Sequence, residues 1–395
     1  MKAGKLFLRA VLVLSLLAGG VLGTGEASAS DTEIPAGYVD LESFGGYASD
    51  NKDDTEAFRA ALATGRNIWL RRGDYMLHET LEVTDQAIVG GGESTKLYFS
   101  NPDPSTPAIR LGGVCMLKDL VVQFEEKLLT GGEKAGERVL VWLGGRKPVE
   151  PGSQLRSVGL NRMGTGIYSP NEENCGASGL RINTVTVTRY VFRGVDFQKD
   201  GQYGNVFYNL YIAAVQKFRE YADVAFAVEG REYNLQVDQL NIEGMPVHTD
   251  LLLRNCRNAQ FGSVHMEQVK LAEPDSGLVK VENSTVRIDG LTAYYIFSDK
   301  RDTALIELGE AREGSGSYLN IGTLHFKGFG SEASGFKSDT GSTFKIVKHT
   351  KGAGGTFRFK LDRYAWYTWL GEADRYAAFP CDEEGIRYLS KGVQE

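Results

Sequence analysis

The sequence is poor in several features that would place it in other protein classes. Only 10 of its 395 residues are proline, so the 48 glycines do not indicate a collagen-like or disordered chain. Acidic residues outnumber basic ones by 51 to 44, and no nucleic-acid partner is expected, because phosphate binding needs a basic surface. Beyond residue 22 no apolar run approaches the roughly 20 residues that cross a bilayer. The excess of glycine instead indicates a globular protein with many tight turns and short strands.

Cysteine is scarce and widely spaced. The four cysteines are Cys115, Cys175, Cys256 and Cys381, and no Cys-x-x-Cys pair or clustered His/Cys spacing occurs among them. A metal site built on cysteine is therefore not expected. In an oxidising compartment the four thiols could form two disulfides, and four buried free thiols are the equal alternative.

The N-terminus has the pattern of an export signal. Three basic residues precede an apolar run at 10–22, and the small residues at 27–29 suit a signal peptidase. The thirteen apolar residues are too few to span a bilayer, so no membrane anchor is expected. The sequence predicts a signal peptide over residues 1–29 and a secreted, extracellular chain that begins near Ser30.

One short helix is predicted near the start of the mature chain. Asp53 and Glu56 have the spacing of a capping box, which opens a helix. The helix should end at Gly65, since glycine is the usual residue just after a helix. The surrounding residues 39–99 have the pattern of short strands, each followed by a turn.

Three motifs lie in order in this region. They are Phe44-Gly45 with Asp53-Asp54-Thr55-x-Ala57-Phe58-x-x-Ala61-Leu62, then Gly73-Asp74-Tyr75, then Ile88-Val89-Gly90-Gly91-Gly92 with Thr95. Together they resemble the N-terminal portion of the pectate-lyase superfamily, which includes polygalacturonase-like hydrolases and many phage tail spikes. Arg72 stands where that family usually has proline. The resemblance implies an all-β fold, a single-stranded right-handed parallel β-helix (solenoid) with a short N-terminal capping helix.

A repeated pattern supports the solenoid in the rest of the chain. The pattern apolar-x-x-apolar-x-apolar recurs at 207–212, 237–242, 261–266, 288–293 and 321–326. Its fourth positions are 30, 24, 27 and 33 residues apart, which is close to one turn of a parallel β-helix with variable loops. Earlier candidate rungs are 109–111, 116–122 and 180–187. No helix-period segment lies between the strands, and this argues against a doubly wound α/β fold.

The chain is thereby divided into four parts. Residues 1–29 are the signal peptide, 30–100 the N-terminal cap and first rungs, 101–356 the rungs with loop excursions, and 357–395 a C-terminal aromatic cap. The excursions are expected at 125–178 and 330–355, which are richer in Gly, Lys, Glu and Ser. The cap holds five aromatic residues and should close the open end of the solenoid, with a sugar-binding platform as the alternative: Tyr364, Trp366, Tyr367, Trp369 and Tyr376.

The same register predicts which side chains point outward. If Leu240 and Ile242 face the core, their neighbours Asn241 and Glu243 face solvent, because side chains alternate along a strand. Five aligned rungs then give two outward columns. The first is Tyr211, Asn241, His265, Thr292 and His325, and the second is Ala213, Glu243, Glu267, Tyr294 and Lys327.

Glu243 and Glu267 should be near neighbours, because successive rungs are about 4.8 Å apart. Two such carboxyl groups can supply an acid and a base together, in the geometry of a retaining glycosidase. We therefore expect Glu243 and Glu267 to serve as acid and nucleophile or base, with His265 beside them. The alternative is a solvated polar ladder with no function.

Elimination is the other chemistry that the columns suggest. A base such as His265, Tyr294 or Lys327 would take the proton α to a uronate carboxyl group, which Arg254 or Arg257 would neutralise. Asn241 and His325 would contact the substrate on the same face.

The better-known motifs of the family are absent, since there is no Asn-Thr-Asp, Gly-His-Gly or Arg-Ile-Lys. No metal site or cofactor is predicted. Calcium stays open, but the acidic segment 50–54 lacks the glycine and the distal glutamate of an EF-hand. The sequence predicts a secreted carbohydrate-active protein that acts on an extended polysaccharide, as a polysaccharide lyase or glycoside hydrolase. The alternative is a non-catalytic binding or adhesion module that resembles a tail-spike trimer.

Overall fold

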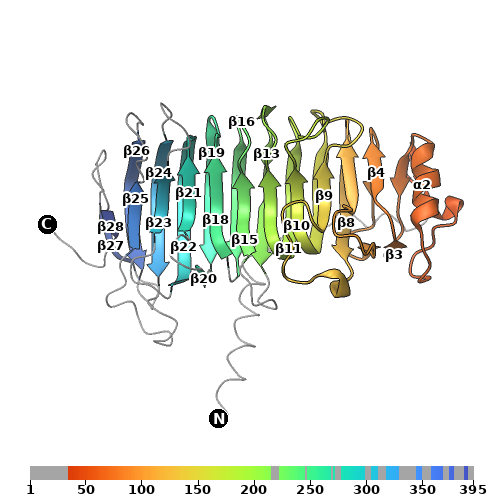
Figure 1. Cartoon of the computed structure of the whole chain (residues 1–395), viewed down its shortest axis with the longest axis horizontal. Helices are drawn as coiled ribbons and strands as arrows, with labels where there is room; N and C mark the ends of the chain where they lie inside the picture. Colours follow the sequence, from red (N-terminus) through yellow and green to blue (C-terminus); the bar gives the residue numbers. More distant parts are fainter. Residues whose placement is uncertain are drawn as a thin grey trace, which may run out of the picture. The chain divides into compact units, whose positions relative to one another are not determined.

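The computed structural model describes residues 34–214, 222–244, 247–267, 270–271, 277–298, 304–309, 317–328, 344–348, 357–367, 373–377 and 387–389. The compact unit begins at Ala36. Its described elements are strands apart from the helix α2 (Thr55–Ala63) and two 3-10 turns, η1 (Leu41–Phe44) and η2 (Glu126–Leu128) (Figure 1). No helix in these ranges is long and apolar enough to span a membrane. The predicted all-β fold with one short helix is confirmed.

The strands stack in two main parallel ladders, so the unit is a parallel β-solenoid. The first ladder contains β1 (Tyr38–Asp40), β2 (Asn67–Trp69), β5 (Ala87–Val89), β8 (Met116–Phe124), β10 (Gln154–Ser169), β11 (Arg181–Phe197), β13 (Val206–Phe207), β14 (Leu210–Ala214), β17 (Gln236–Glu243), β19 (Ala259–Glu267), β22 (Thr285–Ser298), β24 (Ser317–Gly328) and β26 (Phe357–Tyr367).

The second ladder contains β4 (Leu81–Thr84), β7 (Ile109–Gly112), β9 (Val139–Leu143), the later parts of β10 and β11, β15 (Ala222–Val228), β18 (Val247–Arg254), β21 (Gly277–Glu282), β23 (Ala304–Gly309) and β25 (Phe344–Lys348). Shorter strands pair beside these ladders: β3 (Gly73–Leu77), β6 (Thr95–Phe99), β12 (Gln202–Tyr203), β16 (Glu232–Tyr233) and β20 (Lys270–Leu271).

The predicted rungs are confirmed position by position. Their fourth residues are register partners in four successive strand pairs: Leu210, Leu240, Val264, Leu291 and Leu324. Each of these side chains is at most 1% exposed. The six-residue pattern therefore marks one strand of each turn, with its apolar positions facing the interior.

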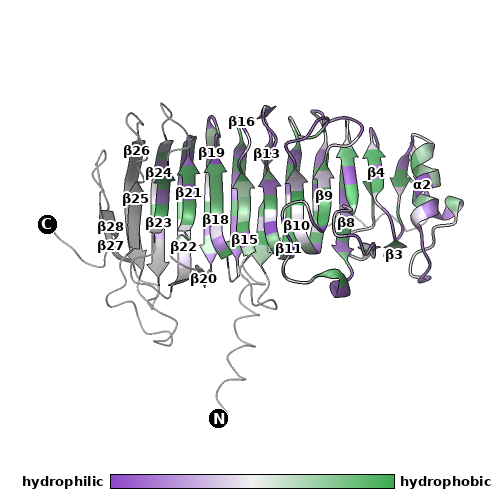
Figure 2. Ribbon diagram, in the orientation of Figure 1, coloured by the Kyte–Doolittle hydropathy of each residue, from purple (hydrophilic) through white to green (hydrophobic). Residues whose placement is uncertain are grey.

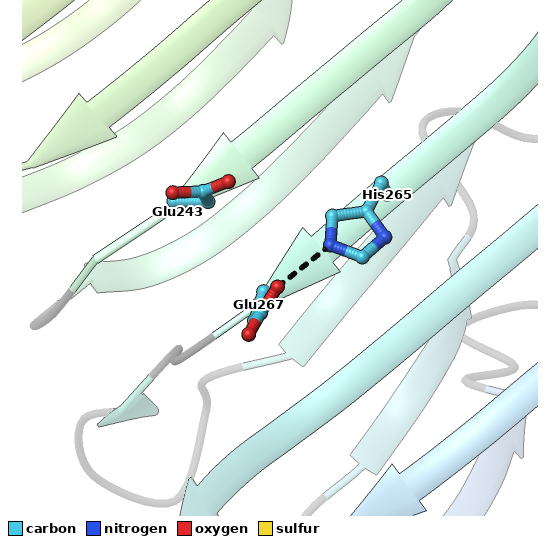
Figure 3. A group of neighbouring side chains, drawn as sticks. All are labelled: Glu243, His265 and Glu267. Atoms are coloured by element: carbon cyan, nitrogen blue, oxygen red, sulfur yellow. Dashed lines mark hydrogen bonds and ion pairs between the residues drawn. The ribbon is translucent and has the colours of Figure 1, made fainter. Parts of the chain in front are cut away.

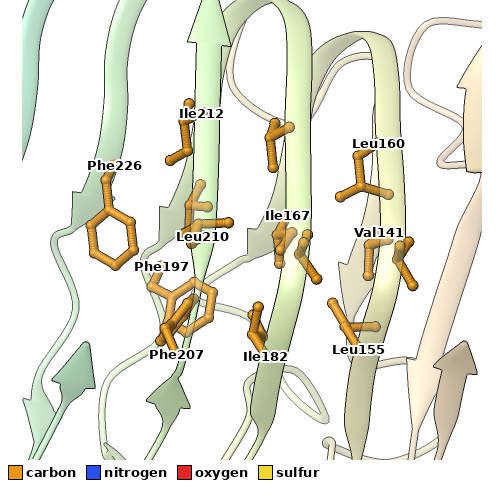
Figure 4. Close-up of a cluster of buried hydrophobic side chains, with 14 of the residues drawn as sticks. Val141, Leu155, Leu160, Ile167, Ile182, Phe197, Phe207, Leu210, Ile212 and Phe226 are labelled. Carbon is orange, nitrogen blue, oxygen red and sulfur yellow. The ribbon is translucent and has the colours of Figure 1, made fainter. Parts of the chain in front are cut away.

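The interior is a continuous column of apolar side chains along the solenoid (Figure 4). It includes a run of edge-to-face or tilted phenylalanines from three turns: Phe197, Phe207, Phe226 and Phe261. Their successive ring centroids are 5.8, 5.4 and 6.3 Å apart, within the range of favourable aromatic pairs. The coloured strands are largely hydrophobic and are interrupted by hydrophilic segments, as the hydropathy colouring shows (Figure 2).

The helix begins near the predicted residue. Thr55, the first residue of α2, donates from both its backbone N–H and its hydroxyl to Asp53 Oδ1. The expected capping box is not formed, because the N-cap residue is Asp54, whose side chain makes no capping hydrogen bond, and the Glu56 carboxylate pairs with Arg59. Phe58 is fully buried on the inner face of α2, where its ring packs edge-on against Tyr75.

The prediction of a loop excursion at 125–178 is wrong for two parts of that segment, 139–143 and 154–169. It contains β9 and the long strand β10, which joins both ladders. Residues 155–160 repeat the rung pattern, with Leu155, Val158 and Leu160 buried, but the polar, glycine-rich composition around them concealed it. The segment 330–355 likewise contains a strand, β25.

The chain changes direction at its C-terminal end. The strands β27 (Ala373–Ala377) and β28 (Arg387–Leu389) pair antiparallel with β26 and β25. The aromatic side chains of the predicted cap lie outside the described residues, as does the predicted signal peptide.

Three of the four cysteines are described, and all three are free and buried: Cys115, Cys175 and Cys256. Two disulfides within the chain would need all four, so that alternative is wrong. Cys381 lies outside the described residues.

Candidate functional site

The register of β17 and β19 brings two glutamates side by side. Glu243 pairs with Glu267, and Asn241 pairs with His265. The intervening Ile242 and Met266 are at most 1% exposed, so the flanking side chains point away from the core. Both predicted columns have the expected register across five strands: Tyr211, Asn241, His265, Thr292 and His325 in one, and Ala213, Glu243, Glu267, Tyr294 and Lys327 in the other.

Three of these side chains form a compact group, which we call the Glu-His-Glu group: Glu243, His265 and Glu267. One nitrogen or oxygen of each lies within 4.8 Å of those of the other two. His265 Nε2 is 3.0 Å from Glu267 Oε2, and Figure 3 shows the two side chains turned toward each other beside Glu243. The side chains of His265 and Glu267 are 27% and 28% exposed, so a ligand can reach them from solvent.

Two tyrosines border the group. Tyr211 donates its hydroxyl to Glu243 Oε2 over 2.8 Å, and the ring of Tyr294 stands edge-on to His265 with centroids 5.9 Å apart. Burial raises the pKa of Tyr211, and the carboxylates of Glu243 and Glu267 add to the rise. Tyr211 therefore keeps its proton and holds the Glu243 carboxylate in place.

Tyr211 is the member of the site whose role the sequence did not predict. Its register partner is Asn241, yet its hydroxyl reaches Glu243, two residues farther along the neighbouring strand. Such a diagonal contact is within reach of a long aromatic side chain. The only indication in the sequence that Tyr211 belongs to the site is its position in the outward column.

The arrangement is suited to proton transfer at a bound substrate. One carboxyl group can give a proton while the other, or the imidazole, accepts one, and the groups are close enough to act on a single bond. One imidazole nitrogen and two carboxylate oxygens can equally hold a divalent transition metal or zinc with open positions.

The two arginines predicted to bind the substrate are not brought to this group. Arg254 lies at the end of β18, where it forms salt bridges with Glu229 and Glu282, the latter at 2.6 Å. The hydrogen bond to Glu282 raises the pKa of Arg254. Arg257 precedes β19, whereas Glu267 is the last residue of that strand. Neither arginine therefore lies beside the group at which it was expected to neutralise the carboxyl group of a uronate substrate.

The remaining predicted contacts lie along the same columns. Thr292 and Tyr294 are on the next strand, β22, and His325 and Lys327 on the one beyond, β24. At about 4.8 Å per strand, β24 is roughly 10 Å from the Glu-His-Glu group. The columns thus extend the site along the solenoid axis.

Comparison with known proteins relates the chain to others by fold alone. No family model matches the chain, and no curated protein sequence matches it. Among solved structures, the catalytic domain of Agl-KA has 16% identity and a TM-score of 0.44, with 83% of this chain and 65% of that domain covered. The chain therefore spans slightly less than two thirds of that domain.

Two further solved structures are similar to the chain. The catalytic unit of a thermostable GH87 alpha-1,3-glucanase from Streptomyces thermodiastaticus strain HF3-3 has 14% identity and a TM-score of 0.44, with 87% of this chain and 71% of that unit covered. The gp42 tailspike of Acinetobacter phage vb_AbaP_AS12 has 11% identity and a TM-score of 0.48, with 91% and 68% covered.

Proposed function

We propose that this protein acts on an extended polysaccharide, with Glu243, His265 and Glu267 as the reacting groups. The observation that carries the proposal is their convergence within 4.8 Å on an outward, solvent-accessible strip. Core packing does not require these residue types, because the buried faces of β17 and β19 are formed by other side chains. The strip continues along several turns, which suits a polymer more than a small molecule.

Hydrolysis is the reaction that the two carboxyl groups favour. One glutamic acid would protonate the glycosidic oxygen while the other carboxylate attacks the anomeric carbon, and water would then hydrolyse the glycosyl-enzyme bond. A separation of about 5 Å between the carboxyl groups is typical of enzymes that retain the anomeric configuration. Tyr211 would hold Glu243, and His265 would hold Glu267.

Elimination is the second reaction that the group supports, because His265 is paired with a carboxylate. An imidazole so placed can take the proton α to a uronate carboxyl group, after which the glycosidic oxygen leaves and a carbon–carbon double bond forms. Since Arg254 and Arg257 lie elsewhere, the substrate carboxylate would be neutralised by Lys327 in the same column or by a divalent cation held by the carboxylates of Glu243 and Glu267.

A panel of neutral and acidic polysaccharides tests the proposal. New reducing ends without ultraviolet absorbance indicate hydrolysis, and reducing ends with the absorbance of an unsaturated uronate indicate elimination. Each assay is repeated with a chelator and with added zinc or calcium, which decides whether a cation takes part. The matched control is Glu93→Gln, which changes an exposed carboxyl group far from the strip in the sequence. Absence of product from every polymer would contradict the catalytic proposal.

A non-catalytic glycan-binding module is the second candidate, favoured by the polar columns that extend beyond the three reacting groups. In that case the chain would bind a polysaccharide without cleaving it and would assemble as a trimer. Retained binding without product, together with a trimeric mass by light scattering, would support it. We further propose that residues 1–29 direct export, so the exported protein should begin near Ser30 on N-terminal sequencing.

A further inference from the structure

A second polar surface lies at the corner where the chain passes from the second ladder to the first. A hollow of about 280 Å³ there is lined by six residues: Asp200, Arg231, Tyr233, Asn255, Arg257 and Asn283. We call this the corner hollow. It precedes β19, whereas the Glu-His-Glu group lies at the end of β17 and β19, so the two surfaces occupy opposite ends of the same strands.

Strand alternation forces the larger side chains of the corner outward. Tyr203 pairs with Tyr233, and Tyr233 pairs in turn with Arg257. The residues just before them are Gln202, Glu232 and Cys256, which are at most 2% exposed. Tyr203 and Tyr233 are 55% and 39% exposed, so two aromatic rings from adjacent turns stand on the surface beside the arginines.

The asparagines of the hollow have a structural role. Asn255 and Asn283 adopt positive φ angles of 61° and 46°, which asparagine tolerates better than most residues. Asn283 Nδ2 donates to Asn255 Oδ1 over 2.8 Å, so the two amides form a ladder across adjacent turns. The backbone conformation of the turn therefore accounts for these two asparagines, which line the hollow.

The arginines have no such explanation. Arg231 and Arg257 are exposed, and neither forms a salt bridge with a carboxylate in the described ranges. Arg257 makes one hydrogen bond, to Asn283 Oδ1 at 3.4 Å, and Asp200 accepts from the backbone N–H of Arg231 rather than from its guanidinium. The hollow thus gathers two guanidinium groups, with Asp200 as the one carboxylate among its lining residues.

A neighbouring pair of arginines shows the contrast. Arg193 forms salt bridges with Asp196, Asp223 and Glu229, and Arg254 forms salt bridges with Glu229 and Glu282. The protein thus neutralises the arginines that stabilise adjacent turns. Those of the corner hollow keep their donors available to a ligand.

We propose that the corner hollow binds an acidic sugar residue of a polysaccharide. Its carboxylate or sulfate group would be held by Arg231 and Arg257, since a guanidinium pairs two donors with such an oxyanion. The pyranose ring would lie against Tyr233, with Tyr203 extending the aromatic surface to the next sugar. This subsite goes beyond the proposed function and does not require the Glu-His-Glu group to be catalytic.

Calorimetric titration of the full chain tests the proposal with three sets of probes of equal length. The first set contains oligouronates, made either of galacturonate or of mannuronate and guluronate. The second is a sulfated oligosaccharide, and the third is the methyl-esterified, neutral oligogalacturonate. We expect an acidic probe to bind and the neutral ester not to bind. Comparison of the oligouronates with the sulfated oligosaccharide shows whether the hollow binds a carboxylate or a sulfate group. In 1 M salt, where the Debye length is about 3 Å, affinity should fall because the contact is exposed.

Variants locate the contact. Arg231→Ala and Arg257→Ala should each weaken binding by about tenfold or more, since a hydrogen bond to a charged group contributes about 1.5–3 kcal/mol. Arg156→Ala removes an exposed arginine from β10 and should leave the affinity unchanged. Hydrogen exchange should slow at 199–204 and 229–234 when the acidic probe is present.

Several outcomes would overturn the proposal. They are no measurable binding of any acidic probe, equal binding of the neutral ester, or affinity unaffected by both arginine variants. Binding that is lost in Glu243→Gln or Glu267→Gln, but kept in the arginine variants, would assign the glycan to the strip alone. Conversely, arginine-dependent binding without turnover would leave the corner hollow established and contradict only the catalytic proposal.

Discussion

The carboxyl group of Asp250 lies close enough to the phenol of Tyr190 to influence it inside the solenoid. Both side chains are at most 1% exposed, and neither has a hydrogen-bond partner among the described residues. Burial raises the pKa of Tyr190, so the phenol keeps its proton. Burial likewise raises the pKa of Asp250 well above its ordinary value. The folded protein therefore holds Asp250 in its neutral form.

Asp250→Asn should make the protein more stable at neutral pH. A carboxyl group with a raised pKa in the folded state keeps its proton while the unfolded chain releases it, so stability falls as pH rises above about 4. The amide cannot ionise and has nearly the same shape. We expect the free energy of unfolding at pH 7 to rise, because only the unfolded parent chain gains by releasing this proton.

Denaturant unfolding at pH 4 and pH 7 measures this effect. The two proteins should differ less at pH 4 than at pH 7, because the carboxyl group of Asp250 is only partly ionised in the unfolded chain at pH 4. Part of the pH dependence should remain in the variant, because burial also raises the pKa of Glu232 to about 8 and that of Asp196 to about 6. The control Glu93→Gln should change stability at neither pH. An Asp250→Asn variant less stable than the parent at pH 7 would contradict the neutral form.

Gly262→Ala should destabilise the protein, whereas Gly290→Ala should not. A Cβ atom at Gly262 would lie 2.6 Å from the backbone oxygen of Asp238 on the preceding turn. At Gly290 its nearest neighbour would be the Gly262 oxygen at 3.9 Å, an ordinary contact. We expect a loss of about 1–3 kcal/mol for the first variant and a change within about 0.5 kcal/mol for the second. Thermal melting of the pair tests the close approach of adjacent turns, and equal melting would contradict it.

Much of the fold could be predicted because one strand of each turn carries a distinctive pattern. The buried positions of β17 and β19 follow apolar-x-x-apolar-x-apolar, which separates them from their polar neighbours. The second ladder lacks such a signal. In β9 all five residues are buried, and a short continuous apolar run does not reveal its period. The sequence therefore predicts β7 of that ladder, at 109–111, but not β9, although the ladder forms the other wall of the core.

The sequence predicts those features of the site that strand register alone determines. Lateral neighbours such as Glu243 and Glu267 follow from alternation and alignment alone. The contact of Tyr211 with Glu243 depends on a side chain that crosses diagonally between strands. The position of Arg257 depends on a corner with left-handed residues such as Asn255 and Asn258, whose direction no periodicity encodes. The position of a residue that depends on turn geometry could therefore not be predicted from the sequence.

The described cysteines should be inert in the folded protein and unnecessary for activity. Cys256 is fully buried, and burial raises the pKa of its thiol. A thiol reagent should react with Cys115, Cys175 and Cys256 only after denaturation, because the thiolate is the reactive form. Replacing each with alanine should leave turnover unchanged even where stability falls. A cysteine variant that melts normally but loses turnover would show that the active site lies elsewhere than the Glu-His-Glu group.

Replacing either glutamate of the Glu-His-Glu group should abolish turnover without unfolding the protein. Glu243 and Glu267 project from the solenoid rather than into it, so Glu243→Gln and Glu267→Gln should each change stability by only about 0.5 kcal/mol or less. Loss of a catalytic acid or base typically slows the reaction by about 10² to 10⁴. Glutamine keeps the hydrogen bonds to Tyr211 and His265 but cannot exchange a proton, so the loss would report chemistry rather than position.

Tyr211→Phe provides the matched comparison for this prediction. It removes the hydroxyl that holds Glu243 and leaves both carboxyl groups in place, so turnover should fall less than in Glu243→Gln. Melting temperature and turnover are measured on the same preparations of all three variants. If turnover is unchanged in both glutamine variants while melting is also unchanged, the strip is a solvated polar ladder. The reaction, where one is found, would then have to be sought elsewhere on the solenoid.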